Sequence, residues 1–161
     1  MRIIVLLDTH VPRMARDIPK AIYEEIKKAD LVLHAGDFTE VSFLEKLRKL
    51  KRTVGVYGNM DSKELSFSLK AKEVIQAGKF RIGLIHGWGA AEGLTDRISE
   101  EFRGDKVDCI VFGHSHHPLS QTIKKVLFFN PGSSTDKIFV PYNSYGILEV
   151  KEKMTSEIVK L

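Results

Sequence analysis

The chain has 161 residues, of which 43% are hydrophobic and 29% are charged, and its formal net charge is +4. This composition excludes an intrinsically disordered chain, because disordered chains lack the apolar residues that build a core. The single cysteine, Cys109, excludes an internal disulfide framework and a multi-cysteine zinc site. No apolar run approaches the roughly 20 residues that span a bilayer, and the N-terminal run is too short for a signal peptide. We expect one domain over residues 1–161, located in the cytoplasm without a membrane partner.

The charge pattern gives little support to nucleic-acid binding. The 25 Lys and Arg residues are interspersed with 21 Asp and Glu residues. The densest basic stretch, residues 46–52, is typical of the solvated end of a helix. Because no basic cluster with interleaved aromatic residues is present, nucleic acid is not expected as a partner except as a substrate.

The first third of the chain predicts alternating strands and helices. Apolar runs at residues 2–7, 31–33 and 53–57 have the length of strands and predict parallel strands that are buried on both faces. Between them, apolar residues at helical spacing predict helices over residues 19–28 and 43–50. This order of elements is typical of an α/β fold with a parallel sheet.

The remainder of the chain has a different pattern. Residues 73–76 and 79–85 predict a hairpin, residues 90–102 predict one helix, and residues 109–112 predict another buried strand. Short strands, mostly antiparallel, are then expected at residues 121–125, 127–129, 145–150 and 153–159. The sequence therefore predicts a mixed α/β domain with parallel and antiparallel portions.

Residue types that bind metals follow five of the predicted buried strands, at their carboxyl ends. They are Asp8, His10, Asp37, Asn59, His86, His114 and His116. Each short motif alone is a common turn or cap pattern. Ligands of open α/β sheets bind beyond the carboxyl ends of the strands, so the combination predicts that these side chains share one cleft.

The chemistry of this set favours two metal ions over one. Seven candidate ligands exceed what one tetrahedral zinc ion needs. Mixed oxygen and imidazole ligands suit manganese, iron, nickel, cobalt or zinc, and suit calcium poorly. Two ions about 3.5–4 Å apart would need a bridging carboxylate between them.

The motifs resemble those of the calcineurin-like metallophosphoesterase superfamily. The family pattern is D-x-H, G-D, G-N-x-D/E, a histidine and G-H-x-H. It stands here, in order, as Asp8-Thr9-His10, Gly36-Asp37, Gly58-Asn59-Met60-Asp61, His86-Gly87 and Gly113-His114-Ser115-His116. The short chain and the later Asn130-Pro131-Gly132-Ser133 resemble the small YfcE-type phosphodiesterases.

This resemblance implies an α/β fold, namely a four-layer α/β/β/α sandwich of two mixed sheets. It also implies a dinuclear centre in which Asp37 bridges two metals. The first metal would be held by Asp8, His10 and His116, and the second by Asn59, His86 and His114. The implied activity is that of a metal-dependent phosphoesterase, specifically a phosphodiesterase, in which a metal-bridging hydroxide attacks a small phosphodiester substrate. Mn²⁺ is the expected ion, with Ni²⁺, Fe²⁺, Co²⁺ and Zn²⁺ as alternatives. Small members of the family often form homodimers, and the sequence leaves the oligomeric state open.

Met60 departs from the pattern of many relatives. They carry a histidine at this position that touches the phosphate and assists the leaving group, whereas a thioether donates no proton. This departure disfavours broad phosphomonoesterase activity. The alternative function is a non-catalytic protein-interaction scaffold of the same fold, similar to vacuolar protein sorting 29. The complete set of ligand positions favours the enzyme.

Several residues near the motifs have expected supporting roles. Asp61 is expected to orient a ligand, His117 to lie on the rim of the site, and His34 to pack close to it. Three aromatic residues are compatible either with a substrate mouth or with the core: Phe38, Trp88 and Tyr142.

Overall fold

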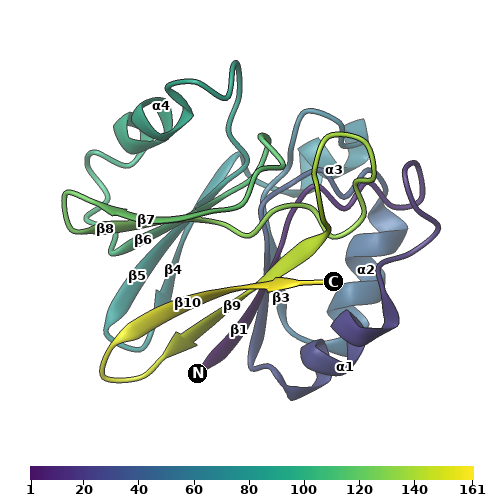
Figure 1. Ribbon diagram of the computed structural model, residues 1–161, viewed down its shortest axis with the longest axis horizontal. Coiled ribbons are helices and arrows are strands. Elements are labelled where there is room, and N and C mark those ends of the chain that lie inside the picture. Colours follow the sequence, from purple (N-terminus) through teal and green to yellow (C-terminus); the bar gives the residue numbers. More distant parts are fainter.

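A computed structural model describes all of residues 1–161 (Figure 1). Its elements in chain order are β1 (Arg2–Leu6), α1 (Lys20–Lys28), β2 (Leu31–His34), α2 (Val41–Leu50), β3 (Thr53–Gly55), α3 (Lys63–Ser68), β4 (Lys72–Ala77), β5 (Phe80–Ile85), α4 (Leu94–Glu101), β6 (Cys109–Phe112), β7 (Leu119–Ile123), β8 (Val126–Asn130), β9 (Ser144–Val150) and β10 (Met154–Lys160). They form two five-stranded sheets, ordered β10-β9-β1-β2-β3 and β4-β5-β6-β8-β7.

The first sheet contains the parallel strands that the sequence predicts at the start of the chain. β1 pairs with β2 and β2 with β3, all in parallel, with Ile3 opposite Leu31 and Val32 opposite Thr53. β9 then lies antiparallel to β1, and β10 lies antiparallel to β9. The predicted parallel order of the first three strands is therefore confirmed.

The second sheet is also mixed. β4 and β5 form the predicted antiparallel hairpin, and β5, β6 and β8 run parallel to one another. β7 pairs antiparallel with β8 at the sheet edge. The four strands after β6 pair mostly antiparallel, as expected, and the parallel pairing of β8 with β6 is the exception. It arises because β7 passes to the outside of the sheet and the chain then turns back, so that β8 fits between β6 and β7.

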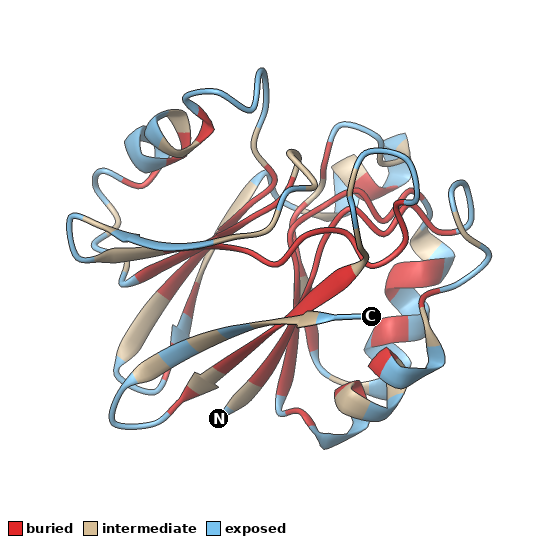
Figure 2. Cartoon of the chain, in the orientation of Figure 1, coloured by how far each residue is buried: buried red, intermediate tan, exposed pale blue.

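Three apolar clusters hold the layers together. The largest, with 16 buried residues, lies between the two sheets and includes Val5, Leu33 and Val111. A second joins the outer face of the first sheet to α1, α2 and α3, and a third joins the second sheet to α4. Figure 1 shows α4 on the opposite side of the molecule from α1 and α2. Figure 2 shows the strands buried along much of their length, while the helices bury mainly one side. The four-layer sandwich is thus confirmed.

Several element boundaries differ from the sequence prediction, and one helix was missed. The helix expected over residues 90–102 begins only at Leu94, because Gly93 has a left-handed backbone with φ of 68°. The third strand ends at Gly55, and Val56 makes only an isolated bridge to Lys70. The short helix α3 was not predicted; the Ser62 side chain caps it by accepting a hydrogen bond from the Leu65 N–H.

The topology brings the carboxyl ends of several parallel strands together, and a ligand-binding site can form beyond them. The carboxyl ends of β1, β2 and β3 in the first sheet, and of β5 and β6 in the second, all lead into the loops that carry the predicted ligands. Loops at this edge of parallel strands are where α/β folds place ligands. No helix combines the length and the apolar character that crossing a membrane requires.

Candidate metal centre

The structure brings all seven predicted side chains together in one cluster. Asp8 and His10 follow β1, Asp37 follows β2, and Asn59 lies beyond β3. The histidines of the second sheet follow β5 and β6. The site therefore lies at the junction of the two sheets, with each sheet supplying part of it.

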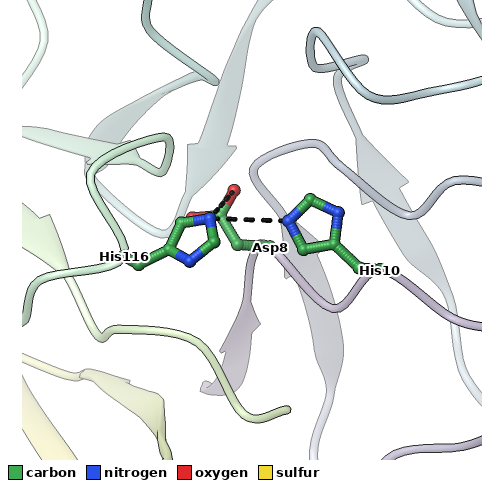
Figure 3. A group of neighbouring side chains, drawn as sticks. All are labelled: Asp8, His10 and His116. Atoms are coloured by element: carbon green, nitrogen blue, oxygen red, sulfur yellow. Dashed lines mark hydrogen bonds and ion pairs between the residues drawn. The ribbon is translucent and has the colours of Figure 1, made fainter. Parts of the chain in front are cut away.

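The first group consists of Asp8, His10 and His116 (Figure 3), and one ligand atom from each lies within 4.8 Å of the others. The Nε2 atoms of His10 and His116 are 3.4 Å apart, and Asp8 Oδ1 is 3.9 Å from His116 Nε2. These spacings allow one ion to contact all three side chains. The group matches the set that the resemblance implies for the first metal.

The second group is built around the Asn59 amide oxygen. Asn59 Oδ1 is 2.9 Å from His86 Nε2 and 3.1 Å from His114 Nδ1. The three atoms come from loops of both sheets and face one another. They form the set that the resemblance implies for the second metal.

Asp37 lies between the two groups. Its Oδ2 is 3.7 Å from His10 Nε2 and 3.5 Å from His86 Nε2. Its other oxygen, Oδ1, accepts a hydrogen bond of 2.7 Å from the Met60 N–H, which fixes the carboxylate. One oxygen of Asp37 can therefore reach both groups.

Three of the histidines donate a hydrogen bond from one ring nitrogen to a neighbouring acceptor. His86 Nδ1 donates to the Ala35 carbonyl and His114 Nε2 to the Gly89 carbonyl, both at 2.8 Å. His116 Nδ1 donates to Asp136 Oδ2 at 2.5 Å. In a neutral imidazole, donation from one nitrogen leaves the other without a proton, and this is the form that binds a metal. In each case the unprotonated nitrogen faces the cluster.

The electrostatics of the cluster fit divalent cations. Burial, reinforced by the charge of Asp37, raises the pKa of Asp8 well above its ordinary value, and burial also raises the pKa of Asp37. Asp8 Oδ2 is buried and has no hydrogen-bond partner. Burial lowers the pKa of His86 to about 4 and lowers that of His10. Neutral imidazoles beside two crowded carboxylates are a donor set that a cation would satisfy, because its charge would stabilise both carboxylates as anions.

The ligand loops have an unusual backbone. Five of the seven predicted ligands adopt positive φ values between 45° and 69°, namely Asp8, His10, Asp37, His114 and His116. Such conformations cost on the order of 1–3 kcal/mol each and cluster at functional sites. The neighbouring Gly36, at φ 92°, allows close packing of these loops, since a Cβ there would lie 2.8 Å from both Gly58 N and His86 Nδ1. The backbone is therefore shaped to aim side chains into the cluster.

Asp61 acts on the ligand loops as the sequence predicts. Its Oδ2 accepts hydrogen bonds from the N–H groups of Asp37 at 3.0 Å and Gly58 at 2.8 Å. Its Oδ1 accepts one from Thr39 at 2.6 Å. The carboxylate thus ties the loop that carries Asp37 to the loop that carries Asn59.

Asp136 is a residue near the centre that sequence reasoning missed. It is 1% exposed, and besides the bond from His116 its Oδ1 accepts hydrogen bonds from the N–H groups of Ile138 and Phe139 at 2.8 and 3.1 Å. Burial acts to raise the pKa of Asp136, but these hydrogen bonds outweigh it and the pKa is lowered. Its only sequence signal is its position just after the Asn130–Ser133 turn.

The Asn130–Ser133 turn hydrogen-bonds to the backbone of two ligand loops. Ser133 Oγ donates to the Asp8 carbonyl at 2.7 Å, and Asn130 Nδ2 donates to the Gly113 carbonyl at 3.3 Å. The loops after β1 and β6 are thereby held to the same segment. The turn therefore fixes the position of two ligand loops at once.

The remaining predicted neighbours are placed as follows. His34 is fully buried and stacks on Phe38 with ring centroids 3.5 Å apart, so both belong to the core. His117 is exposed and its side chain hydrogen-bonds to the Ser115 carbonyl, as expected for the rim. Trp88 is 44% exposed and lies beside the second group, whereas Tyr142 packs under Lys160.

Comparisons with known proteins agree with this geometry. Residues 1–153 match the sequence model of the calcineurin-like phosphoesterase superfamily domain. A probable metallophosphoesterase of Methanocaldococcus jannaschii is 33% identical over 163 residues, which cover 100% of this chain and 82% of that protein. A phosphodiesterase of the same organism is 22% identical over 174 residues, which cover 99% of each chain.

Solved structures share the whole fold. The solution NMR structure of a Thermotoga maritima protein has a TM-score of 0.79 at 32% identity, with 99% of each chain covered. The crystal structure of Vps29 from Entamoeba histolytica, complexed with Zn²⁺, has a TM-score of 0.78 at 27% identity, again with 99% of each chain covered. The arrangement of two facing sheets with outer helices is common to them.

Proposed function

The chain belongs to the calcineurin-like phosphoesterase superfamily, and on that premise we propose that it is a dinuclear metal-dependent phosphodiesterase. The proposed ligands are Asp8, His10 and His116 for one ion and Asn59, His86 and His114 for the other, with Asp37 shared. The observation that carries this proposal is the position of Asp37 Oδ2, within 3.7 Å of a histidine from each group. A carboxylate oxygen placed in this way is what a bridged pair of ions requires.

The chain's own residues bind and orient the reactants. When bound, divalent ions would polarise a phosphate ester and lower the pKa of a coordinated water. Two such ions would outweigh the negative charge of Asp8 and Asp37, so the loaded site would attract an anionic ester. The hydrogen bonds to Ala35, Gly89 and Asp136 keep the imidazoles in their ligating form. Mn²⁺ is the ion we favour, because the donors combine carboxylate, amide and imidazole groups.

The absence of a proton donor at position 60 favours diesters with good leaving groups. Met60 is 44% exposed and its N–H is bonded to Asp37, which places it beside the proposed bridge. A thioether supplies no proton to a departing alkoxide. Activated diesters, which need no such proton, are the substrates we expect to react fastest.

A protein-interaction scaffold is the second candidate, because the fold is also that of Vps29. Metal binding alone does not separate the two functions, since that Vps29 structure contains Zn²⁺. Hydrolysis does separate them. The complete donor set, oriented by Asp61 and Asp136, supports the enzyme.

The proposal is tested by removing and restoring metal. Protein stripped with a chelator should lose hydrolysis of bis(p-nitrophenyl) phosphate, and Mn²⁺ should restore it. Asp37→Asn should lower both metal content and turnover, the latter by roughly 100-fold or more, while circular dichroism shows a retained fold. Asp96→Asn, which changes an exposed carboxylate on α4, is the matched control and should behave as wild type. Full activity in metal-free protein, or two ions and a normal rate in Asp37→Asn, would refute the proposal.

A further inference from the structure

A pocket of about 370 Å³ opens directly beside the second group of ligands. Asn59 and His86 form part of its wall, and Tyr57 and Trp88 contribute aromatic surface. Its volume lies within the range of small-molecule sites, roughly 300–1,000 Å³. A phosphate held at the metal centre would therefore have a concave space for one of its ester groups next to it.

The pocket is formed where the edges of the two sheets meet. Tyr57 follows β3 of the first sheet, and its N–H donates to the Lys70 carbonyl at 3.1 Å, just before β4 of the second. Trp88 follows β5, and Arg97 holds its carbonyl with bonds of 3.2 Å from Nε and 3.0 Å from Nη2. The main chain is thus anchored at both aromatic residues, while the Trp88 side chain stays 44% exposed. The Trp88 indole is therefore exposed to solvent, while hydrogen bonds hold its main chain in place.

Two charged side chains line the pocket, Lys72 and Glu101. Lys72, which lines it, donates to the Glu101 carbonyl at 2.7 Å and pairs with Asp105 at 2.8 Å. No lining cation is therefore left to attract a second phosphate. Aromatic walls beside a paired cation and a carboxylate suit an uncharged ring and disfavour an anionic one, because uncharged rings stack on any planar π face.

We propose that this pocket binds an uncharged planar ring, of the aryl or nucleobase type, carried by one ester group of the diester substrate. Trp88 and Tyr57 are the residues that would confer this specificity. The inference rests on the proposed function and adds the substrate class. The exposed loop residues Ile138 and Phe139 are a competing apolar surface, because the Phe139 ring lies next to His116. We favour the pocket because it is concave, whereas Phe139 is 66% exposed.

The test compares two ligands that differ only in the ring. Phenylphosphonate and methylphosphonate are titrated calorimetrically into Mn²⁺-loaded wild-type protein, with metal content checked. Phenylphosphonate should bind about tenfold more tightly. Trp88→Ala should reduce that ratio to about one to two, Tyr57→Ala should reduce it partly, and methylphosphonate affinity should be unchanged in both. Phe67→Ala, which removes an 88% exposed ring outside the pocket, should keep the wild-type ratio.

Each other result has a defined meaning. Equal binding of both phosphonates to wild type overturns the inference, as does a ratio that survives Trp88→Ala and Tyr57→Ala. If Phe139→Ala abolishes the preference for phenylphosphonate instead, the ring binds beside the Phe139 loop and the inference is overturned. Loss of methylphosphonate binding in Trp88→Ala would show that Trp88 supports the metal centre and not the ring. If wild type binds neither phosphonate, the proposed function itself fails and the inference falls with it.

Discussion

Asp136→Asn is the substitution that most sharply separates positioning of a ligand from ligation itself. The change keeps Oδ1 and therefore the two backbone hydrogen bonds from Ile138 and Phe139. It replaces Oδ2, the acceptor for His116 Nδ1, with an NH₂ group. Two donors then face each other, which favours the imidazole tautomer with its proton on Nε2, the nitrogen that faces Asp8 and His10.

The expected magnitude follows from the single bond that is lost. A hydrogen bond to a charged acceptor contributes about 1.5–3 kcal/mol. If that energy is lost mainly from metal binding, affinity falls by roughly 10–100-fold, which matches the usual effect of removing a partner of a ligating histidine. Because Asp136 touches no reactant, kcat should recover at saturating Mn²⁺.

Calorimetric titration of the apo-protein with Mn²⁺ measures this affinity, and hydrolysis rates at rising Mn²⁺ concentration measure the recovery. Asp96→Asn again serves as the control, because it removes an exposed carboxylate on α4 that lies outside the ligand loops. Mn²⁺ affinity within twofold of wild type would refute the positioning role. A kcat that stays low at saturating metal would show instead that Asp136 acts in the reaction.

Four further substitutions have distinct expected outcomes. At matched metal content, Met60→His should raise kcat/KM for diesters with poor leaving groups by up to roughly 100-fold. It should change kcat/KM for nitrophenyl esters little, and equal gains for both substrate classes would contradict a proton-donor role. His116→Ala should lose both bound metal and hydrolytic activity, whereas His117→Ala should retain both. If elemental analysis and rate measurements show similar losses in the two variants, this assignment is wrong. Asp61→Asn loses acceptors for backbone N–H groups and should destabilise the apo-protein by about 1–3 kcal/mol in denaturant unfolding; an unchanged midpoint would show that the loops do not depend on it.

The sequence predicts most of the fold because its strands are long apolar runs. The runs at residues 2–7 and 109–112 are buried on both faces, and both are strands in the structure. The orientation of β8 was not predictable, because alternation of apolar residues carries no direction and the parallel pairing to β6 depends on where β7 lies. The helix start at Leu94 depends on the left-handed conformation of Gly93, which glycine permits but does not require.

The candidate site is predictable to the extent that its residues follow strands. All seven proposed ligands stand beyond strand ends, so topology alone gathers them. Asp136 was missed because it is 20 residues from His116 in the chain, and no local pattern marks a contact that only the folded turn creates. The positive φ values of Asp8 and His10 could not be predicted from the sequence either, since non-glycine residues adopt them only when tertiary contacts impose them.

The dinuclear assignment is tested most directly by titrating apo-protein with Mn²⁺ while bound metal and hydrolysis of bis(p-nitrophenyl) phosphate are measured on the same samples. The shared position of Asp37 predicts that the rate reaches its plateau only when two ions are bound per chain. A full rate with one ion or none, or two bound ions without hydrolysis, would contradict it.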